Sequence, residues 1–325
     1  MNNIFEDRVV LLTGGTGSFG QNFVKYILKN QRPKSVRIFS RDELKQHDMR
    51  QQFEDDTLRF FIGDVRDKER LHRAMHGVDF VIHAAALKQV PSCEYNPFEA
   101  VKTNIIGSEN VINAAIDCRV GKVLALSTDK AVSPVNLYGA TKLCAEKMFV
   151  QGNSYTGGST KNSCVRYGNV IGSRGSVVPL FKKQKEEGVL TLTDKRMTRF
   201  WITYEQAIGL VIKSLENMVG GEVFVPKIPS MRILELAKAI GPECELMEIG
   251  IRPGEKIHEV LITQEEARNT YEFDEYYLVE PQYRWWDKAN MKGGKKVDKE
   301  FVYSSDNNEK WLSIEELNGM IKDME

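Results

Sequence analysis

The stretch from Ser127 to Lys142 contains side chains that could move protons to and from an alcohol. Tyr138 and Lys142 are four residues apart, and residues at this spacing share one face of a helix. A nearby ammonium group stabilises a phenolate, as does a helix amino terminus, so Tyr138 could act as a base near neutral pH. Thr128 lies upstream, where its hydroxyl group could orient the alcohol. The alternative is a packed tyrosine and a surface lysine.

Asp129 and Lys130 add a second acid–base pair to this centre. Oxidation or epimerisation of an alcohol moves one hydride and one proton and needs no such pair. Loss of water beside a ketone needs a base for the C–H proton and an acid for the departing hydroxyl group. We expect burial and the charge of Lys142 to depress the pKa of Lys130, and an apolar pocket to keep Asp129 protonated. Neighbours on a regular strand point to opposite faces, so the strand must bend here; an exposed Asp–Lys turn is the alternative.

A glycine-rich segment, Thr13–Gly20, lies between an apolar run and a helical pattern. Its three spaced glycines let the backbone turn tightly, approach a pyrophosphate and pack the helix on a sheet. The helix amino terminus offers free N–H groups and a positive dipole end to phosphates. We therefore predict a dinucleotide site in which Lys142 also holds the nicotinamide ribose; a purely structural turn is the alternative. The predicted contacts in this loop are Gly14, Thr16, Gly17, Ser18, Phe19 and Gly20.

The next strand ends in Ser40, Arg41 and Asp42, which we predict to contact the cofactor. NAD-binding folds usually place an acidic residue here, whereas an arginine suits the 2′-phosphate of NADP. Lys45 could add a second cation, so the charges favour NADP. The alternative is that Arg41 only pairs with Asp42 at a helix start. The remaining predicted cofactor contacts follow later strands and are Asp64, Val65, Ala84, Ala85, Ala86, Lys88 and Val170.

The elements that must position these groups are alternating strands and helices. Phe19, Phe23 and Ile27 recur every four residues and indicate a helix with one buried stripe. All-apolar strands joined by helices predict a parallel sheet covered on both faces, a Rossmann-type doubly wound α/β fold. The expected strands are Val9–Leu12, Val36–Phe39, Phe60–Ile62, Phe80–His83, Val123–Leu126 and Cys164–Tyr167.

Beyond about Gly168 the alternation loosens. Helical patterns at Tyr204–Asn217 and Arg232–Ile240 lie among loops that hold several prolines. We predict a cofactor-binding Rossmann domain over residues 1–168. Residues 169–325 should form a smaller substrate-binding lobe without a full core of its own, with strands and helices exchanged between the two.

The overall composition excludes several classes of partner. Acidic and basic residues balance at 45 each in 325 residues, so no bulk charge favours nucleic acid or a membrane surface. The five cysteines are scattered, which indicates reduced, mostly buried thiols and neither disulfides nor a metal site. Met1–Arg8 is polar, and no later apolar run could span a bilayer. We expect a cytoplasmic globular protein.

Several long strings in the sequence resemble the UDP-N-acetylglucosamine 4,6-dehydratases of the extended short-chain dehydrogenase/reductase family. The closest likeness is to the configuration-inverting enzymes that begin pseudaminic acid biosynthesis for flagellin glycosylation. The likeness covers essentially the whole chain. The strings are Thr13–Gly20, Ser40–Lys45, Phe61–Asp67, Ala84–Pro91, Ser127–Lys142, Arg166–Pro179, Arg196–Thr203, Arg252–Val260 and Tyr303–Leu312.

The resemblance implies a redox-neutral loss of water from UDP-N-acetylglucosamine by C4 oxidation, C5 deprotonation and hydride return to C6. The implied product is UDP-2-acetamido-2,6-dideoxy-β-L-arabino-hexos-4-ulose, with tightly bound NADP regenerated in each turnover. Tyr138 would take the C4 hydroxyl proton, Lys130 the C5 proton, and Asp129 would protonate the C6 oxygen. Lys142 would support the phenolate and the ribose. Related dTDP-glucose dehydratases carry Asp-Glu in place of Asp-Lys, which argues against that substrate.

The resemblance also implies a homo-oligomer, a dimer or a hexamer, and a set of groups that hold the UDP-sugar, all but Lys88 in residues 169–325. Arg199 and Arg252 would bind the diphosphate, and Glu255 the uridine ribose. For each except Arg252 a purely structural role is the alternative. We interpret Trp285 and Trp286 as packing or interface residues and His83 as a core histidine. The predicted substrate contacts are Lys88, Asn169, Arg174, Val178, Arg199, Arg252 and Glu255.

Other functions remain open for the same centre. A C5-retaining dehydratase, a UDP-hexose 4-epimerase and a 4-keto reductase would all use Tyr138 and Lys142. The last two have no need of Asp129 and Lys130, and a reductase would consume NADPH stoichiometrically. A catalytically idle NADP-sensing protein on the same fold is the alternative outside enzymes.

Overall fold

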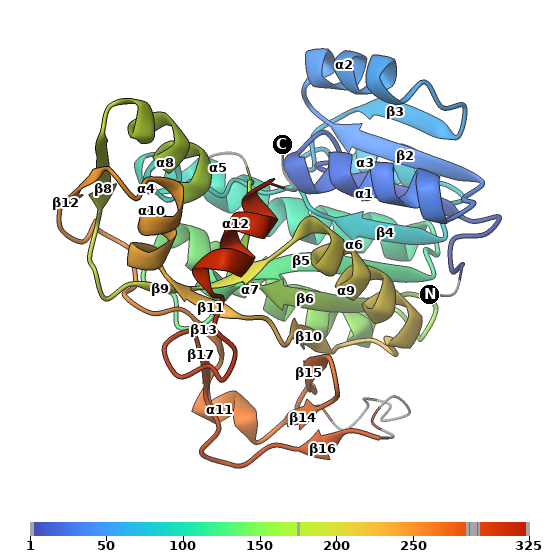
Figure 1. Cartoon of the computed structure of the whole chain (residues 1–325). Coiled ribbons are helices and arrows are strands. Elements are labelled where there is room, and N and C mark those ends of the chain that lie inside the picture. Colours follow the sequence, from blue (N-terminus) through green and yellow to red (C-terminus); the bar gives the residue numbers. More distant parts are fainter. Residues whose placement is uncertain (1–2, 174–175, 284–285, 287–290, 292, 323–325) are drawn as a thin grey trace.

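The structure, a computed structural model, describes residues 3–173, 176–283, 286, 291 and 293–322. Its largest element is a sheet with strand order β16-β14-β15-β10-β6-β5-β4-β1-β2-β3 (Figure 1). Neighbouring strands from β3 to β10 in this order are parallel. The pairs β10–β15, β15–β14 and β14–β16 are antiparallel. The strands are β1 (Val9–Thr13), β2 (Ser35–Ser40), β3 (Leu58–Ile62), β4 (Phe80–His83), β5 (Lys122–Thr128), β6 (Lys161–Tyr167), β10 (Val223–Pro226), β14 (Thr270–Glu272), β15 (Tyr276–Val279) and β16 (Lys295–Lys296).

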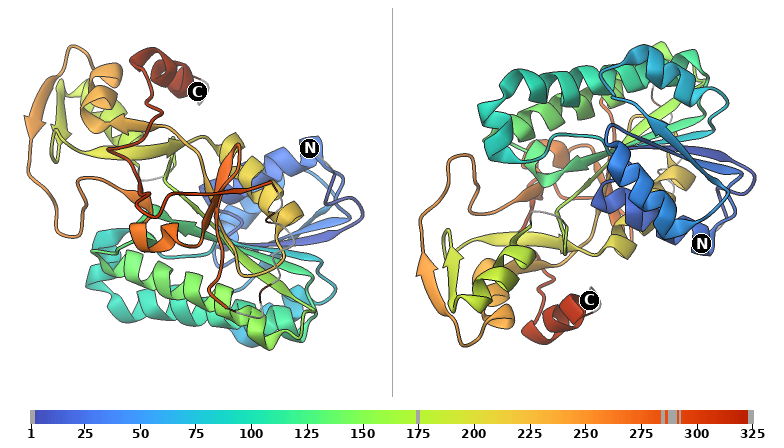
Figure 2. Two further views of the ribbon diagram at one scale, coloured as in Figure 1. Left: turned by 90° about the horizontal axis from the view of Figure 1, so that it is seen from below. Right: turned by 90° about the horizontal axis from the view of Figure 1, so that it is seen from above.

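Helices cover both faces of this sheet, which explains why its central strands are apolar throughout. Figure 2 shows α6 and α7 on one face and α1 and α9 on the other. Every residue of β1 is buried, so neither side of that strand meets water. The helices are α1 (Ser18–Asn30), α2 (Glu43–Phe53), α3 (Lys68–Met75), α4 (Val90–Tyr95), α5 (Pro97–Val101), α6 (Gly107–Asp117), α7 (Leu137–Gly152) and α9 (Tyr204–Asn217), with a π-helical turn at Lys102–Ile106.

The predicted fold class is confirmed. Each of the six expected strands lies within an observed one, and the order β3-β2-β1-β4-β5-β6 is that of a doubly wound sheet. The predicted apolar stripe of α1 buries Phe23 and Ile27 completely, while Phe19 is partly buried. Truncating a buried phenylalanine such as Phe23 to alanine costs about 3–5 kcal/mol of stability.

The chain beyond residue 168 contributes to both parts of the molecule. β10, β14, β15 and β16 extend the large sheet, so its edge is built from the second half of the sequence. Other elements of this half include a smaller lobe, of which α8 (Val177–Glu186), β8 (Val189–Leu192), α10 (Ile233–Ile240) and β12 (Glu245–Glu248) lie at the left of Figure 1. The remaining elements of this half are β7 (Asn169–Val170), β9 (Thr198–Ile202), β11 (Ser230–Arg232), β13 (Val260–Ile262), α11 (Gln264–Ala267), β17 (Tyr303–Ser304) and α12 (Ile314–Lys322).

The smaller lobe has a hydrophobic core of its own, contrary to expectation. Phe181 and Trp201 are among its fully buried side chains, and Leu236 and Leu317 complete it from α10 and α12. These residues come from segments far apart in the sequence, so no local pattern indicates that they meet. The predicted helix at Tyr204–Asn217 is confirmed, and the one predicted from Arg232 begins one residue later.

Several minor expectations are also settled by the structure. His83 is buried, and Thr13 and Ser108 form hydrogen bonds with its ring nitrogens, so it is a satisfied core histidine. Burial lowers the pKa of His83 to about 3.

All five cysteines are free, but only Cys93 and Cys164 are buried, so the expectation of mostly buried thiols is wrong. Trp286 is a core residue, and Trp285 lies outside the described residues. No helix in the described ranges is long and apolar enough to cross a membrane.

Candidate active site

A cavity of about 1110 Å³ runs along the carboxyl ends of the parallel strands and is closed by the smaller lobe. Residues that directly follow β1, β3 and β4, and the ends of β2 and β5, line one side. Ligands of doubly wound sheets bind at this edge, where the strand order reverses.

The glycine-rich loop forms one end of the cavity. Gly14 has φ +66°, and a Cβ there would lie 2.9 Å from the backbone of Ala85, so the loops after β1 and β4 touch. Gly17 caps α1 without a side-chain hydrogen bond, which leaves the N–H groups of the first turn available to an anion. Every residue predicted as a cofactor contact, from Gly14 to Val170, lines the cavity.

Arg41 lines the same end and does not pair with Asp42, which was the alternative interpretation of its role. Its guanidinium lies 3.7 Å from Asp64, which also binds Arg66 at 2.7 Å. Asp42 instead caps α2, accepts a hydrogen bond from the backbone of Lys45 and pairs with its ammonium at 2.7 Å. Two cations therefore stand at the end of β2, each with a carboxylate beside it.

The chemical centre lies where β5 stops. The strand ends at Thr128, and Asp129–Ala131 turn as a 3₁₀ helix, which is the bend that the sequence analysis required. Thr128 donates a hydrogen bond to Oδ1 of Asp129 at 2.8 Å, and Nζ of Lys130 lies 3.1 Å from the same oxygen. Lys130 lines the cavity, whereas Asp129 is completely buried and does not. Thr128 and Lys130 thus connect Asp129 with the cavity.

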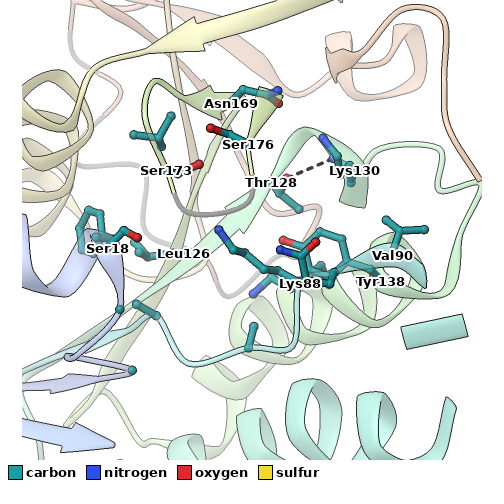
Figure 3. Close-up of a pocket in the computed structure, with 18 of the residues that line it drawn as sticks. Ser18, Lys88, Val90, Leu126, Thr128, Lys130, Tyr138, Asn169, Ser173 and Ser176 are labelled. Carbon is teal, nitrogen blue, oxygen red and sulfur yellow. Dashed lines mark hydrogen bonds between the residues drawn. The ribbon is translucent and has the colours of Figure 1, made fainter. Parts of the chain in front are cut away.

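Tyr138 and Lys142 enter from α7, whose first turn packs against the turn that carries Lys130. The side chain of Asn136 accepts a hydrogen bond from the backbone of Gly139 at 2.8 Å and starts the helix. A Cβ at Gly139 would lie 2.1 Å from the carbonyl oxygen of Lys130, so only glycine permits this approach. Figure 3 shows the side chains of Lys88, Thr128, Lys130 and Tyr138 gathered on one side of the cavity.

The two lysines of the centre differ in electrostatics. Burial lowers the pKa of Lys142, which faces the cavity. Burial alone would also lower the pKa of Lys130, but the carboxylates of Asp129 and Glu259 outweigh it and raise that pKa above its ordinary value. The expectation of a depressed pKa for Lys130 is therefore wrong, because two carboxylates lie beside it, whereas the sequence predicted a protonated Asp129 and no role for Glu259. Burial raises the pKa of Tyr138 to about 12, although Lys130 acts in the opposite direction.

Glu259 is the functional candidate that sequence reasoning missed. Its Oε1 lies 3.3 Å from Nζ of Lys130, and it lines the cavity although it is only 2% exposed. Lys256 lies near the other carboxylate oxygen, at 3.8 Å. Both belong to the string Arg252–Val260, which carried the family resemblance without a role for these two positions. That string was the available signal.

A buried ion-pair network fixes α7 to the sheet and to the second half of the chain. Arg166 on β6 binds Glu146 of α7 and Glu266 of α11, the latter at 2.9 Å. Ser127 of β5 donates a hydrogen bond to the same glutamate of α7 at 2.8 Å. This glutamate lies one turn beyond Lys142, so the network holds both chemical segments, β5 and α7, in one arrangement.

The predicted substrate contacts are only partly brought together. Lys88, Asn169, Arg252 and Glu255 line the cavity with Arg199. The guanidinium of Arg199 donates to the carbonyl oxygens of Thr198, Lys256 and Ile257 at 2.7–3.0 Å, so it holds the cavity wall. Val178 does not reach the cavity, because α8 turns it into the core of the smaller lobe. Arg174 lies outside the described residues.

Comparison with known proteins fits this architecture. Residues 10–281 match the family described as "Polysaccharide biosynthesis protein". The chain belongs to this family. A family relative from Campylobacter jejuni, named UDP-N-acetylglucosamine 4,6-dehydratase (inverting), is 52% identical over 97% of this chain and 97% of its own. The resemblance to these dehydratases expected from the sequence is thereby confirmed.

Two further similarities bear on whether this chain catalyses dehydration or epimerisation. A protein of Rickettsia felis named UDP-glucose 4-epimerase is 43% identical over 99% of this chain and 97% of its own. The X-ray structure of Pen from Bacillus thuringiensis superimposes with a TM-score of 0.90 at 40% identity, covering 99% of each chain. Family membership alone therefore leaves the choice between dehydration and epimerisation to the chemistry of the site.

Proposed function

We propose that this protein is an NADP-dependent UDP-N-acetylglucosamine 4,6-dehydratase, a hydro-lyase that inverts C5. The observation that carries the proposal is the Asp129–Lys130 pair. This pair directly follows Thr128 at the end of β5, and Lys130 lines the cavity together with Tyr138. Nζ of Lys130 lies 3.1 Å from Oδ1 of Asp129. Epimerisation and ketone reduction require no such pair. The name of the Campylobacter relative supports both the substrate and the inversion.

The residues around the glycine-rich loop fit a nicotinamide dinucleotide. The uncapped first turn of α1 suits its pyrophosphate, and Arg41 with Lys45 suits the 2′-phosphate that distinguishes NADP from NAD. Lys142 lines the cavity where the nicotinamide ribose would lie. When bound, the nicotinamide would supply reversible hydride transfer with the sugar carbons.

The protein's own groups supply the proton transfers. Tyr138 takes the proton of the C4 hydroxyl group, which Thr128 orients. Its pKa of about 12 in the ligand-free protein must fall when the dinucleotide and sugar bind; a positive charge beside a phenolate acts in that direction. The resulting C4 ketone acidifies the C5 proton, which Lys130 removes.

Asp129 and Lys130 can reach their reactive forms together. Transfer of one proton over the 3.1 Å between them converts the ion pair into a neutral amine and a carboxylic acid. The amine then takes the C5 proton. The carboxylic acid of Asp129 donates its proton to the C6 oxygen, which leaves as water. Thr128, whose hydroxyl group lies 2.8 Å from Oδ1 of Asp129, is one of the two residues that connect Asp129 with the cavity. Hydride return to C6 leaves an enolate, which takes a solvent-derived proton at C5 on the face opposite to the lost one and so gives the inverted product. Protons and electrons then balance without an external oxidant.

The diphosphate and uridine would be held on the wall formed by the smaller lobe. Arg252 faces the cavity and supplies positive charge for the diphosphate. Glu255 has a buried carboxylate oxygen, Oε2, with no hydrogen-bond partner in the described residues, which suits a ribose hydroxyl donor. The resemblance further supports a homo-oligomer and a place at the start of pseudaminic acid or a related 6-deoxy amino sugar.

A UDP-hexose 4-epimerase is the second candidate, favoured by the name of the Rickettsia relative and by the Thr128, Tyr138 and Lys142 set. Incubation with UDP-N-acetylglucosamine in deuterated water, without added cofactor, separates the two functions by NMR and mass spectrometry. Dehydration predicts loss of one water, one deuterium at C5 and a 4-ketone, with the C5–C6 couplings reporting inversion. A changed C4 configuration with no deuterium at C5 would overturn the dehydratase proposal.

A further inference from the structure

Glu259 lies at the centre of a group of charges in the cavity wall. Its Oε1 is 3.3 Å from Lys130 and 3.8 Å from Arg199, and its Oε2 is 3.8 Å from Lys256. Oε2 is buried and has no hydrogen-bond partner within the described part of the chain. Among the described residues, the charged partners of this carboxylate are therefore three cations.

The backbone of Glu259 is fixed by the segment Tyr303–Leu312, for which the sequence analysis found a resemblance but no role. The N–H group of Glu259 donates to Oγ of Ser305 at 2.9 Å, and the N–H group of Ser305 donates to the carbonyl oxygen of Glu259 at 2.8 Å. The same Oγ lies 2.6 Å from Oγ1 of Thr198. Adjacent pairing of β13 with β17 continues this contact. Three distant segments thus cooperate to place one carboxylate.

We propose that Glu259 is a positioning residue for the C5 proton transfer, which holds Nζ of Lys130 at the cavity wall between two carboxylates and sets when its proton leaves. The inference rests on the proposed dehydratase function and extends it by one residue. Asp129 anchors Lys130 from its own turn, and Glu259 anchors it from the segment before β13. Two anchors on separate elements define the position of the nitrogen, whereas one would let the flexible side chain swing.

The charges around Lys130 support this role. Asp129 and Glu259 face it with negative charge, while Arg199, Lys256 and Lys88 contribute positive charge and Tyr138 is a neutral phenol. Lys130, Arg199 and Lys256 against the two carboxylates carry a formal net charge of +1. Transfer of the Lys130 proton to Asp129 stays within this set and leaves its net charge unchanged, so Glu259 then remains as the carboxylate beside the cations.

The test compares Glu259→Gln with Glu259→Asp and the native protein. Each is charged with NADP and mixed with UDP-N-acetylglucosamine over a range of pH. Absorbance at the reduced-nicotinamide band reports C4 oxidation, and deuterium uptake at C5 reports proton removal. Glu259→Gln should lower the rate of C5 exchange on the order of a hundredfold, because the base is misplaced, while C4 oxidation persists.

The pH profile separates positioning from a purely structural role. Glu259 raises the pKa of Lys130. In Glu259→Gln the pH at which the C5 exchange rate falls off on the acidic side should therefore move down by roughly one unit. Glu259→Asp should recover part of the rate and the native limb. Glu243→Gln, at an exposed position, is the matched control and should match the native protein.

An unmoved acidic limb in Glu259→Gln, or a C5 exchange rate equal to that of the native protein, would overturn the inference. Equal losses of C4 oxidation and C5 exchange in both variants, with lower melting temperatures, would also overturn it and indicate a structural role. Failure of the proposed function looks different: the native protein itself would then show no C5 exchange in the presence of its cofactor.

Discussion

Lys130 and Lys142 lie in the same cavity and twelve residues apart in the sequence, but the protein surrounds them differently. Lys142 extends from a regular helix into a region where burial dominates, and its pKa falls. Lys130 extends from a 3₁₀ turn between Asp129 and Glu259, and its pKa rises. Two lysines of one centre thus have opposite shifts, and the difference comes from the carboxylates beside them.

This difference separates two parts of the proposed reaction. In that proposal the α7 side, with Tyr138 and Lys142, serves hydrogen transfer at C4 and holds the cofactor. The β5 side, with Asp129 and Lys130, has a proton that can be exchanged between amine and carboxylate. A dehydrogenase needs only the groups on the α7 side. The groups on the β5 side are therefore the reason to propose loss of water rather than simple oxidation.

The largest effect is expected where both parts depend on one group. Tyr138→Phe removes the phenol that takes the C4 proton, so no ketone forms and neither half of the reaction proceeds. The turnover rate should fall roughly 10⁴-fold, the upper range for loss of a general base. Tyr155→Phe, at a tyrosine that is 73% exposed, is the control and should change nothing. A Tyr138→Phe variant that still reduces its bound cofactor would contradict this role of Tyr138.

Substitution of the two lysines should separate the halves. Lys130→Met should block C5 deuterium exchange by about 10³-fold yet still allow reduction of bound NADP, because the ketone forms but the base is missing. Lys142→Met should instead slow NADP reduction itself. Stopped-flow absorbance and NMR measure the two steps. Lys68→Met, at an exposed pair with Asp117, serves as the control. Equal losses of NADP reduction and C5 exchange in Lys130→Met and Lys142→Met would contradict the assignment of the two lysines to separate steps.

The buried network behind the cavity should affect stability more than any single surface contact. Glu146→Gln leaves Arg166 with Glu266 as its remaining carboxylate partner and should lower the free energy of unfolding by about 3 kcal/mol, measured by urea denaturation. An exposed Glu243→Gln variant should unfold like the native protein. A loss below about 0.5 kcal/mol would show that the network does not hold α7 in place.

The same network predicts a pH dependence. Burial would raise the pKa of Glu266, but Arg166 outweighs it and the pKa falls below its ordinary value of 4.5. A carboxyl group with a depressed folded pKa stabilises the fold above its unfolded pKa, and this stability is lost as pH falls through the folded value. The melting temperature should therefore decline below about pH 4.5, and the decline should be shallower in Glu266→Gln. Parallel curves would contradict this.

The smallest effect concerns the choice of cofactor. Arg41→Ala removes the cation closest to the predicted 2′-phosphate and should weaken NADP binding roughly tenfold while NAD binding changes little. Calorimetric titration of cofactor-free protein measures both. Arg32→Ala, at an exposed position outside the cavity, is the control. An equal loss for NADP and NAD would assign Arg41 to the adenosine instead.

Local patterns in the sequence were enough to predict the sheet, the glycine-rich loop and the Tyr138–Lys142 pair. Each depends on residues within one βαβ unit, where spacing determines which side chains share a face. The bend after Thr128 was also predictable, because two neighbouring residues could not otherwise serve one site. The same reasoning failed for Val178, which lies beside cavity residues in sequence but on the core face of α8.

The rest of the site depends on contacts between distant segments. Glu259 meets Lys130, and Glu266 meets Arg166, only because the second half of the chain folds back over the ends of β5 and β6. No periodicity connects such positions. The direction of the Lys130 pKa was therefore predicted wrongly, although its identity as a member of the centre came from the sequence.

The most direct test of redox-neutral dehydration follows one labelled hydrogen. UDP-N-acetylglucosamine that carries deuterium at C4 is converted by the NADP-loaded protein, and the product is analysed by NMR. The deuterium should move to the C6 methyl group, because the hydrogen removed in the first half of the reaction is returned in the second. Deuterium that remains at C4 of a sugar nucleotide, or that leaves in released reduced cofactor, would contradict it.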